Sequence, residues 1–153
     1  MSALLAVDAG LRTGLALLDR RGRLQWCRSH NLGTTVRLKK AAARVLFELP
    51  LLEYLVVEGG GQIAGVWEHA AARRGLPCMV IQAHDWRADF LLPREMASGD
   101  KATAAACALL ARVVRGEGWS SPTTPGHDAA EAALIGLWAA VRLGWRTMPS
   151  IKQ

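Results

Sequence analysis

Short apolar runs separated by turns that contain Gly and Asp dominate the first third of the chain. Residues 4–8 form an apolar run that ends in Asp8, and a second run spans residues 15–18. Residues 23–32 alternate imperfectly between apolar and polar positions. Such segments, joined by short turns, are typical of neighbouring antiparallel strands, so the pattern predicts a three-stranded meander.

The rest of the chain alternates between helical and strand patterns. Apolar residues recur at helical spacing over residues 36–49, where Thr34 or Thr35 can cap the helix. Two apolar runs, residues 55–58 and 77–82, predict buried strands. Further helices are expected at residues 63–74, 84–92 (a short helix or a loop), 100–114 and 128–143.

The order of these segments predicts the fold class. A three-stranded meander followed by β–α–β crossovers gives an α/β protein with a mixed five-stranded sheet and helices on both faces. In such a sheet the first and fourth strands can lie side by side. The length of 153 residues fits a single domain, which we place at residues 1–147, followed by a flexible tail at residues 148–153.

Composition excludes several classes of protein. The chain is 51% hydrophobic, which indicates a folded protein, yet no apolar stretch approaches the ~18 residues that span a bilayer. The N-terminus lacks a secretory signal pattern. Cys27, Cys78 and Cys107 match neither a disulfide framework nor a zinc site. We therefore expect buried, reduced thiols in a cytoplasmic protein that is not secreted, not bound to a membrane and without an organic cofactor.

Positive charge is concentrated near the N-terminus. Residues 12–44 contain nine Lys or Arg and one acid, a net charge of +8 compared with +6 for the whole chain. This region is either a surface for a polyanion such as DNA or a solvated surface that aids solubility. Arg12, in the turn after the first strand, is a candidate DNA contact. Lys39 and Lys40 are two more, because they should point outward from a helix that packs on the sheet.

Carboxylates interrupt three apolar segments. Asp8 and Glu58 each end an apolar strand, and Asp128 and Glu131 share one face of the last helix. A buried carboxylate is costly unless it is paired or binds a cation. Mg²⁺ and Mn²⁺ prefer carboxylate oxygens, and two such ions ~3.5–4 Å apart can hydrolyse a phosphodiester by activating water and stabilising the leaving oxygen. The four acids therefore predict a site for two divalent ions.

Each of these residues also has a purely structural explanation. Asp8 could cap a turn, and Glu58 could pair with a buried arginine. Asp128 and Glu131 could stabilise the start of their helix. His127 could help to activate water, or simply lie on the surface. The combination of two strand-end acids with a helical pair favours the metal site.

In these features the chain resembles the RNase H-like nucleases and, within them, the RuvC-type Holliday junction resolvases. The resemblance rests on residues 4–19, on Val56-Val57-Glu58, on residues 127–132 and on the order of elements along nearly the whole chain. It extends to His84-Asp85-Trp86-Arg87 and Gly99-Asp100-Lys101-Ala102-Thr103. Relatives have a Trp-Arg or Trp-Lys pair there, followed by a lysine that faces DNA phosphate.

The resemblance implies a function and roles for these residues. It implies that the four acids bind Mg²⁺ or Mn²⁺, that Lys101 lies near the scissile strand and that Arg87, positioned by Trp86, contacts DNA. It also implies a homodimer that places paired nicks on a four-way DNA junction, associated with the nucleoid if the source is bacterial or phage. Many relatives have Asp where Glu131 stands.

One feature of the resolvases is missing. Gly59-Gly60-Gly61 replaces the aromatic residue with which relatives unstack bases at the junction. Trp67 could take over this role, or belong to the core or the dimer interface.

Other functions remain open on the same fold. An RNA-processing nuclease similar to the YqgF branch would use the same acids on structured RNA, and a non-catalytic module would bind nucleic acid without cutting it. The turn Asp-Ala-Gly-x-x-x-Gly also resembles the first phosphate loop of actin-like ATPases. Those proteins need two such domains, for which 153 residues are too few. We therefore expect a metal-dependent endodeoxyribonuclease for four-way junctions.

Overall fold

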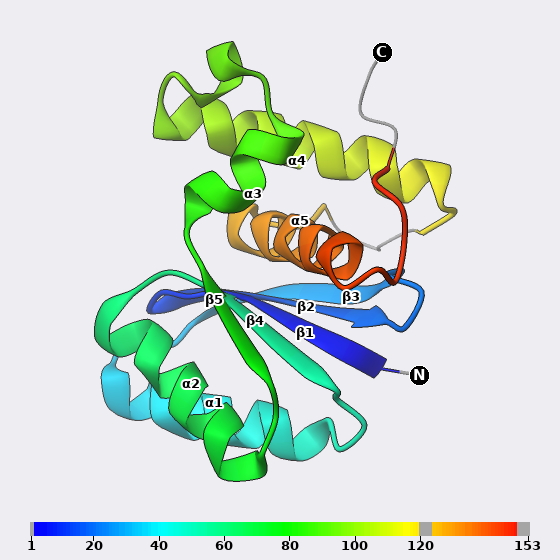
Figure 1. Cartoon of the computed structure of the whole chain (residues 1–153). Coiled ribbons are helices and arrows are strands. Elements are labelled where there is room, and N and C mark those ends of the chain that lie inside the picture. Colours follow the sequence, from blue (N-terminus) through cyan, green and yellow to red (C-terminus); the bar gives the residue numbers. More distant parts are fainter. Residues whose placement is uncertain (1, 120–123, 150–153) are drawn as a thin grey trace.

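A five-stranded sheet in the order β3-β2-β1-β4-β5 forms the centre of the computed structural model, which describes residues 2–119 and 124–149 (Figure 1). β1 pairs antiparallel with β2 and parallel with β4, so the predicted meander and crossovers are confirmed. The strands are β1 (Ser2–Asp8), β2 (Arg12–Asp19), β3 (Leu24–Asn31), β4 (Tyr54–Glu58) and β5 (Cys78–Ile81).

Helices cover both faces of the sheet, as predicted. α1 and α2 lie side by side on one face, while α5 packs on the other face with α3 and α4 outside it (Figure 1). This arrangement is consistent with an RNase H-like fold. The helices are α1 (Thr35–Glu48), α2 (Gly61–Arg74), α3 (Ala83–Phe90), the short 3₁₀ helix η1 (Pro93–Met96), α4 (Gly99–Gly116) and α5 (His127–Arg142).

Some elements begin earlier than the sequence pattern predicted. β2 begins at Arg12 because the expected turn continues the ladder, with Gly14 opposite Asp8. α2 begins at Gly61, so the third glycine is helical. Residues 83–90 form a helix that Gln82 and Asp85 cap reciprocally. The sequence also predicts a loop over residues 119–126, between the last two helices. Residues 120–123 of this loop and residues 150–153 of the expected tail lie outside the described residues.

Two further expectations concern the membrane and the cysteines. In the described part of the chain, no helix combines the length and the apolarity that crossing a bilayer requires.

Cys27, Cys78 and Cys107 are free thiols, half-buried rather than fully buried. Burial raises the pKa of the Cys27 thiol to about 11, so this thiol is protonated at neutral pH.

The alternation of side chains along the strands fills a separate core on each face of the sheet. On β1, Leu5 and Val7 face α1 and α2, whereas Leu4 and Ala6 face α5. Trp67 belongs to the first of these cores, and its side chain is only 1% exposed. Because it has no free surface, Trp67 is a core residue, and the alternatives of a base-unstacking or dimer contact are wrong.

Two glycines set how closely α5 approaches the sheet. A Cβ atom at Gly14 would overlap the backbone oxygen of Asp128, and one at Gly136 would overlap the side chain of Leu18. α5 is buried along most of its length. The missing side chain of Gly14 therefore lets the first turn of α5 rest on the start of β2, beside Asp8 on β1.

We expect Gly14→Ala to lower the free energy of unfolding by about 2 kcal/mol or more, because the added methyl group meets backbone atoms that cannot move alone. Urea denaturation measures the change. Gly65→Ala is the matched control, since no atom lies within 4 Å of a Cβ there and alanine favours the helix. Equal losses in the two variants would contradict the proposed role of Gly14 in packing.

Candidate active site

The parallel pairing of β1 with β4 brings the two strand-end acids together. Asp8 and Glu58 are register partners at the last position of the two strands. Residues at alternate positions of a strand share a face of the sheet. Asp8 therefore projects to the same side as Leu4 and Ala6, toward α5. The prediction that Asp8 and Glu58 are neighbours is confirmed.

The first two turns of α5 bring in the other two acids. Gly126 is the N-cap of α5, so Asp128 lies in the first turn and not at the cap. Glu131 follows one turn later, and its side chain is only 10% exposed. The backbone N–H of Ala129 donates to Ser29 Oγ at 3.1 Å, which fixes the start of α5 against β3. All four acids thus gather at one edge of the sheet.

The electrostatics of this edge are those of carboxylates placed close together. Burial, followed by repulsion from Glu58, Glu131 and Asp128, raises the pKa of Asp8 to about 8. Burial also raises the pKa of Glu58, against the opposing effects of the Trp86 hydrogen bond and the positive charge of Arg87. The cluster is therefore short of positive charge, which a divalent cation would supply.

Donors from α3 and α4 hold two of the carboxylates. Trp86 Nε1 donates to Glu58 Oε1 at 3.3 Å. Arg87 Nη2 and Thr103 Oγ1 donate to Glu131 Oε1 at 2.9 and 3.3 Å. Arg87, which is half-buried, therefore forms its ion pair with Glu131 and not with Glu58, for which the structural alternative required a buried arginine.

None of these three donors was predicted as a partner of the acids. Trp86 was expected to position Arg87, and the Arg87 guanidinium does lie 5.3 Å from the centre of its ring. The bond from Trp86 to Glu58 had no signal in the sequence. Thr103 could have been found only from its place two residues after Lys101, on the face of α4 that meets α5.

The remaining candidate residues lie around the acid cluster or away from it. Arg12 is exposed at the start of β2, with Nε 4.0 Å from Asp128 Oδ2. Lys101 and His127 are exposed in the first turns of α4 and α5. Arg87 faces inward, with a side chain that is 21% exposed.

Lys39 and Lys40 lie elsewhere. Both side chains are exposed on α1, as predicted, but α1 covers the opposite face of the sheet from α5 (Figure 1). These two lysines therefore do not belong to the acid cluster.

The four acids are neighbours, but their side chains do not form a ready ligand cage. Within residues 2–119 and 124–149, no three His, Cys, Asp or Glu side chains stand close enough together to hold one metal ion. One reason is that Glu131 is turned to Arg87 and Thr103. The donor set itself, which consists of carboxylate oxygens alone, fits Mg²⁺ or Mn²⁺ better than softer metals.

Comparisons with known proteins do not assign this site. No protein-family model matches the chain, and a search of curated proteins finds no significant match. The geometry of the acid cluster is therefore the basis on which a function can be assigned.

The raised pKa of Asp8 predicts how stability depends on pH without metal. Asp8 is protonated in both states below about pH 4. Between pH 4 and its folded-state pKa of about 8, unfolding releases a proton, so the free energy of unfolding falls as pH rises. In EDTA, Asp8→Asn should lack this decline and exceed wild type by about 5 kcal/mol at pH 8. Denaturation at several pH values measures the difference, and parallel curves would show that Asp8 does not cause the decline.

Proposed function

We propose that the protein is a metal-dependent endonuclease that cuts branched DNA, with the four-way junction as its substrate. The observation that carries the proposal is the gathering of four carboxylates at one sheet edge, from two strands and one helix. Their mutual repulsion favours the binding of Mg²⁺ or Mn²⁺, with two ions in one site. These acids are Asp8, Glu58, Asp128 and Glu131.

The position of each acid supports a particular role in phosphodiester hydrolysis. When bound, the divalent ions would supply the charge that activates water and stabilises the leaving oxygen. Asp8, which is repelled by all three other acids, would help to hold the ions. Glu58 and Glu131 would be further ligands, oriented by Trp86 and Thr103.

Basic residues at the same edge support a polyanionic substrate. Arg12, 4.0 Å from Asp128, and Lys101, in the first turn of α4, are both exposed and would hold phosphates of the strand that is cut. His127 is exposed beside Asp128 and would orient the attacking water. The products would carry 5′-phosphate and 3′-hydroxyl ends. A homodimer, acting on DNA in the cytoplasm, would cut the two strands symmetrically.

Cleavage of a synthetic four-way junction tests this proposal. We expect paired nicks in Mg²⁺ or Mn²⁺, none in EDTA, and little cutting of linear duplex or of an RNA–DNA hybrid. Faster cutting of structured RNA would favour the RNA-processing nuclease instead. Tight binding of the junction without cutting would favour the non-catalytic module. A protein that neither binds nor cuts the junction would overturn the proposal.

A further inference from the structure

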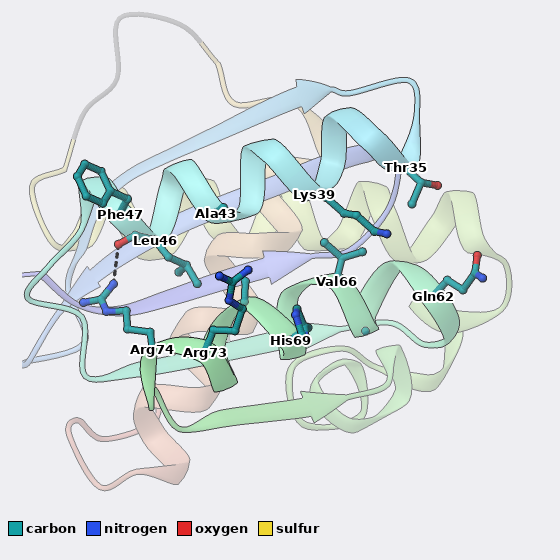
Figure 2. A pocket seen from close by; sticks show the side chains of 12 residues that line it. Thr35, Lys39, Ala43, Leu46, Phe47, Gln62, Val66, His69, Arg73 and Arg74 are labelled. Carbon is teal, nitrogen blue, oxygen red and sulfur yellow. Dashed lines mark hydrogen bonds between the residues drawn. The ribbon is translucent and has the colours of Figure 1, made fainter.

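A groove of about 860 Å³ runs between α1 and α2, on the face of the sheet opposite α5 (Figure 2). Its floor is formed by small and apolar side chains, among them Ala43, Leu46, Val66 and Ala70. α1 and α2 each contain 14 residues, so the groove can extend over about 21 Å.

The rim of the groove is basic. Lys39 reaches from α1 toward α2, while His69 and Arg73 rise from α2 toward α1 (Figure 2). Arg74 donates from Nη1 to the backbone oxygen of Leu46 at 2.6 Å, which places a fixed positive charge at the far end. Among the described residues that line the groove, none is acidic. The groove therefore presents positive charge that no carboxylate within it neutralises.

The groove begins at the sheet edge that carries the acid cluster. β4 ends in Glu58 and leads directly into α2 at Gly61. β3 runs in the same direction as β1, because both pair antiparallel with β2, and it leads into α1 at Thr35. Thr35 and Gln62 line the mouth of the groove at this edge. The basic rim thus extends from the catalytic edge down the opposite face.

We propose that this groove binds a nucleic-acid strand that extends away from the acid cluster. The inference rests on the proposed function for the class of ligand, and it adds a binding site on the other face of the sheet. A strand combines phosphates for the rim with sugar and base surfaces for the apolar floor. Phe47, at the far end, is 85% exposed and offers a ring on which a base can stack.

Charge and position favour this occupant over two others. A second copy of this chain would bring Lys39 and Arg73 against an equally basic groove, and the like charges would repel. An acidic amphipathic helix from another protein would match the charge and the apolar floor. An acidic helix would not explain why the groove starts at the edge that carries the acids. A nucleic-acid strand explains this position, because a strand that reaches the cleavage site must continue beyond that site.

Binding without cleavage tests the inference. The parent is Asp8→Asn in EDTA, and the probe is a fluorescent four-way junction followed by anisotropy over a range of salt concentrations. Adding Lys39→Glu and Arg73→Glu should weaken binding about tenfold and reduce the salt slope by about 2. Adding Arg112→Glu and Arg115→Glu, two exposed arginines of α4, is the matched control and should change affinity less than about twofold. The milder pair Lys39→Gln and Arg73→Gln repeats the test if charge reversal prevents folding.

Each outcome separates this inference from the proposed function. Equal affinities of the groove variant and the α4 control would overturn the inference, while cleavage by the wild type would leave the proposed function intact. Unchanged affinity with a lost dimer in sedimentation would assign the groove to a second copy and overturn the inference. If the groove variant binds DNA with unchanged affinity but no longer binds a poly-glutamate peptide, the groove belongs to an acidic protein segment. This outcome would also overturn the inference. Failure of the proposed function would show as a wild type that cuts nothing.

Discussion

Asp8→Asn is expected to lower the rate of Mg²⁺-dependent junction cleavage at least about 1,000-fold, which corresponds to about 4 kcal/mol of transition-state stabilisation. Asp8 is the register partner of Glu58 on the neighbouring strand, and burial together with repulsion from Glu58, Glu131 and Asp128 raises its pKa. An amide in its place keeps the shape but removes the negative charge with which Asp8 would help to hold the ions. Single-turnover cleavage of a labelled four-way junction measures the loss.

The control separates loss of chemistry from loss of structure or binding. Asp100→Asn changes an exposed aspartate in the first turn of α4 in the same way, and its cleavage rate should stay within about twofold of wild type. Asp8→Asn should bind the junction as tightly as wild type and unfold no more easily in EDTA. Undiminished cleavage by Asp8→Asn would contradict the catalytic role of this acid. Equal losses of cleavage rate in Asp8→Asn and Asp100→Asn would show that the loss is not specific to Asp8.

The meeting of Asp8 with Glu58 could be predicted because local patterns determine it. Each acid ends an apolar run, and the order of strands and helices requires β1 and β4 to be parallel neighbours. Asp128 and Glu131 could be added because a spacing of three residues places both on one face of a helix. The sheet and the four acids at its edge thus follow from periodicity and chain order.

Contacts between distant segments could not be predicted in the same way. Gly14 looked like a turn residue, and only its packing against the backbone of Asp128 explains why a glycine stands there. Trp86 and Thr103 meet the acids because α3 and α4 pack beside α5, which no local pattern encodes. The groove between α1 and α2 likewise depends on how two separate helices lie side by side (Figure 2).

Arg87 shows best how tertiary structure changes an interpretation. The sequence places it among residues that contact DNA, whereas the structure pairs it with Glu131 inside the protein. We expect Arg87→Met to lower the free energy of unfolding by about 3 kcal/mol in EDTA, because it leaves a largely buried carboxylate without a counter-charge. Arg44→Met is the matched control. Its partner Glu48 is exposed, so the loss should be about 0.5 kcal/mol.

The same pair predicts how Mg²⁺ acts on stability. If Glu131 is a metal ligand, a bound cation replaces the charge that Arg87→Met removes. Mg²⁺ should therefore raise the free energy of unfolding of Arg87→Met more than that of wild type, in which the ion must compete with the guanidinium. Adding Glu131→Gln to Arg87→Met should recover much of the lost stability in EDTA and abolish the extra effect of Mg²⁺. Denaturation of wild type, Arg87→Met and the double variant, in EDTA and in Mg²⁺, measures both effects. An equal response to Mg²⁺ in all three proteins would mean that Glu131 serves only as the structural partner of Arg87, and the cluster would then hold metal with the remaining three acids.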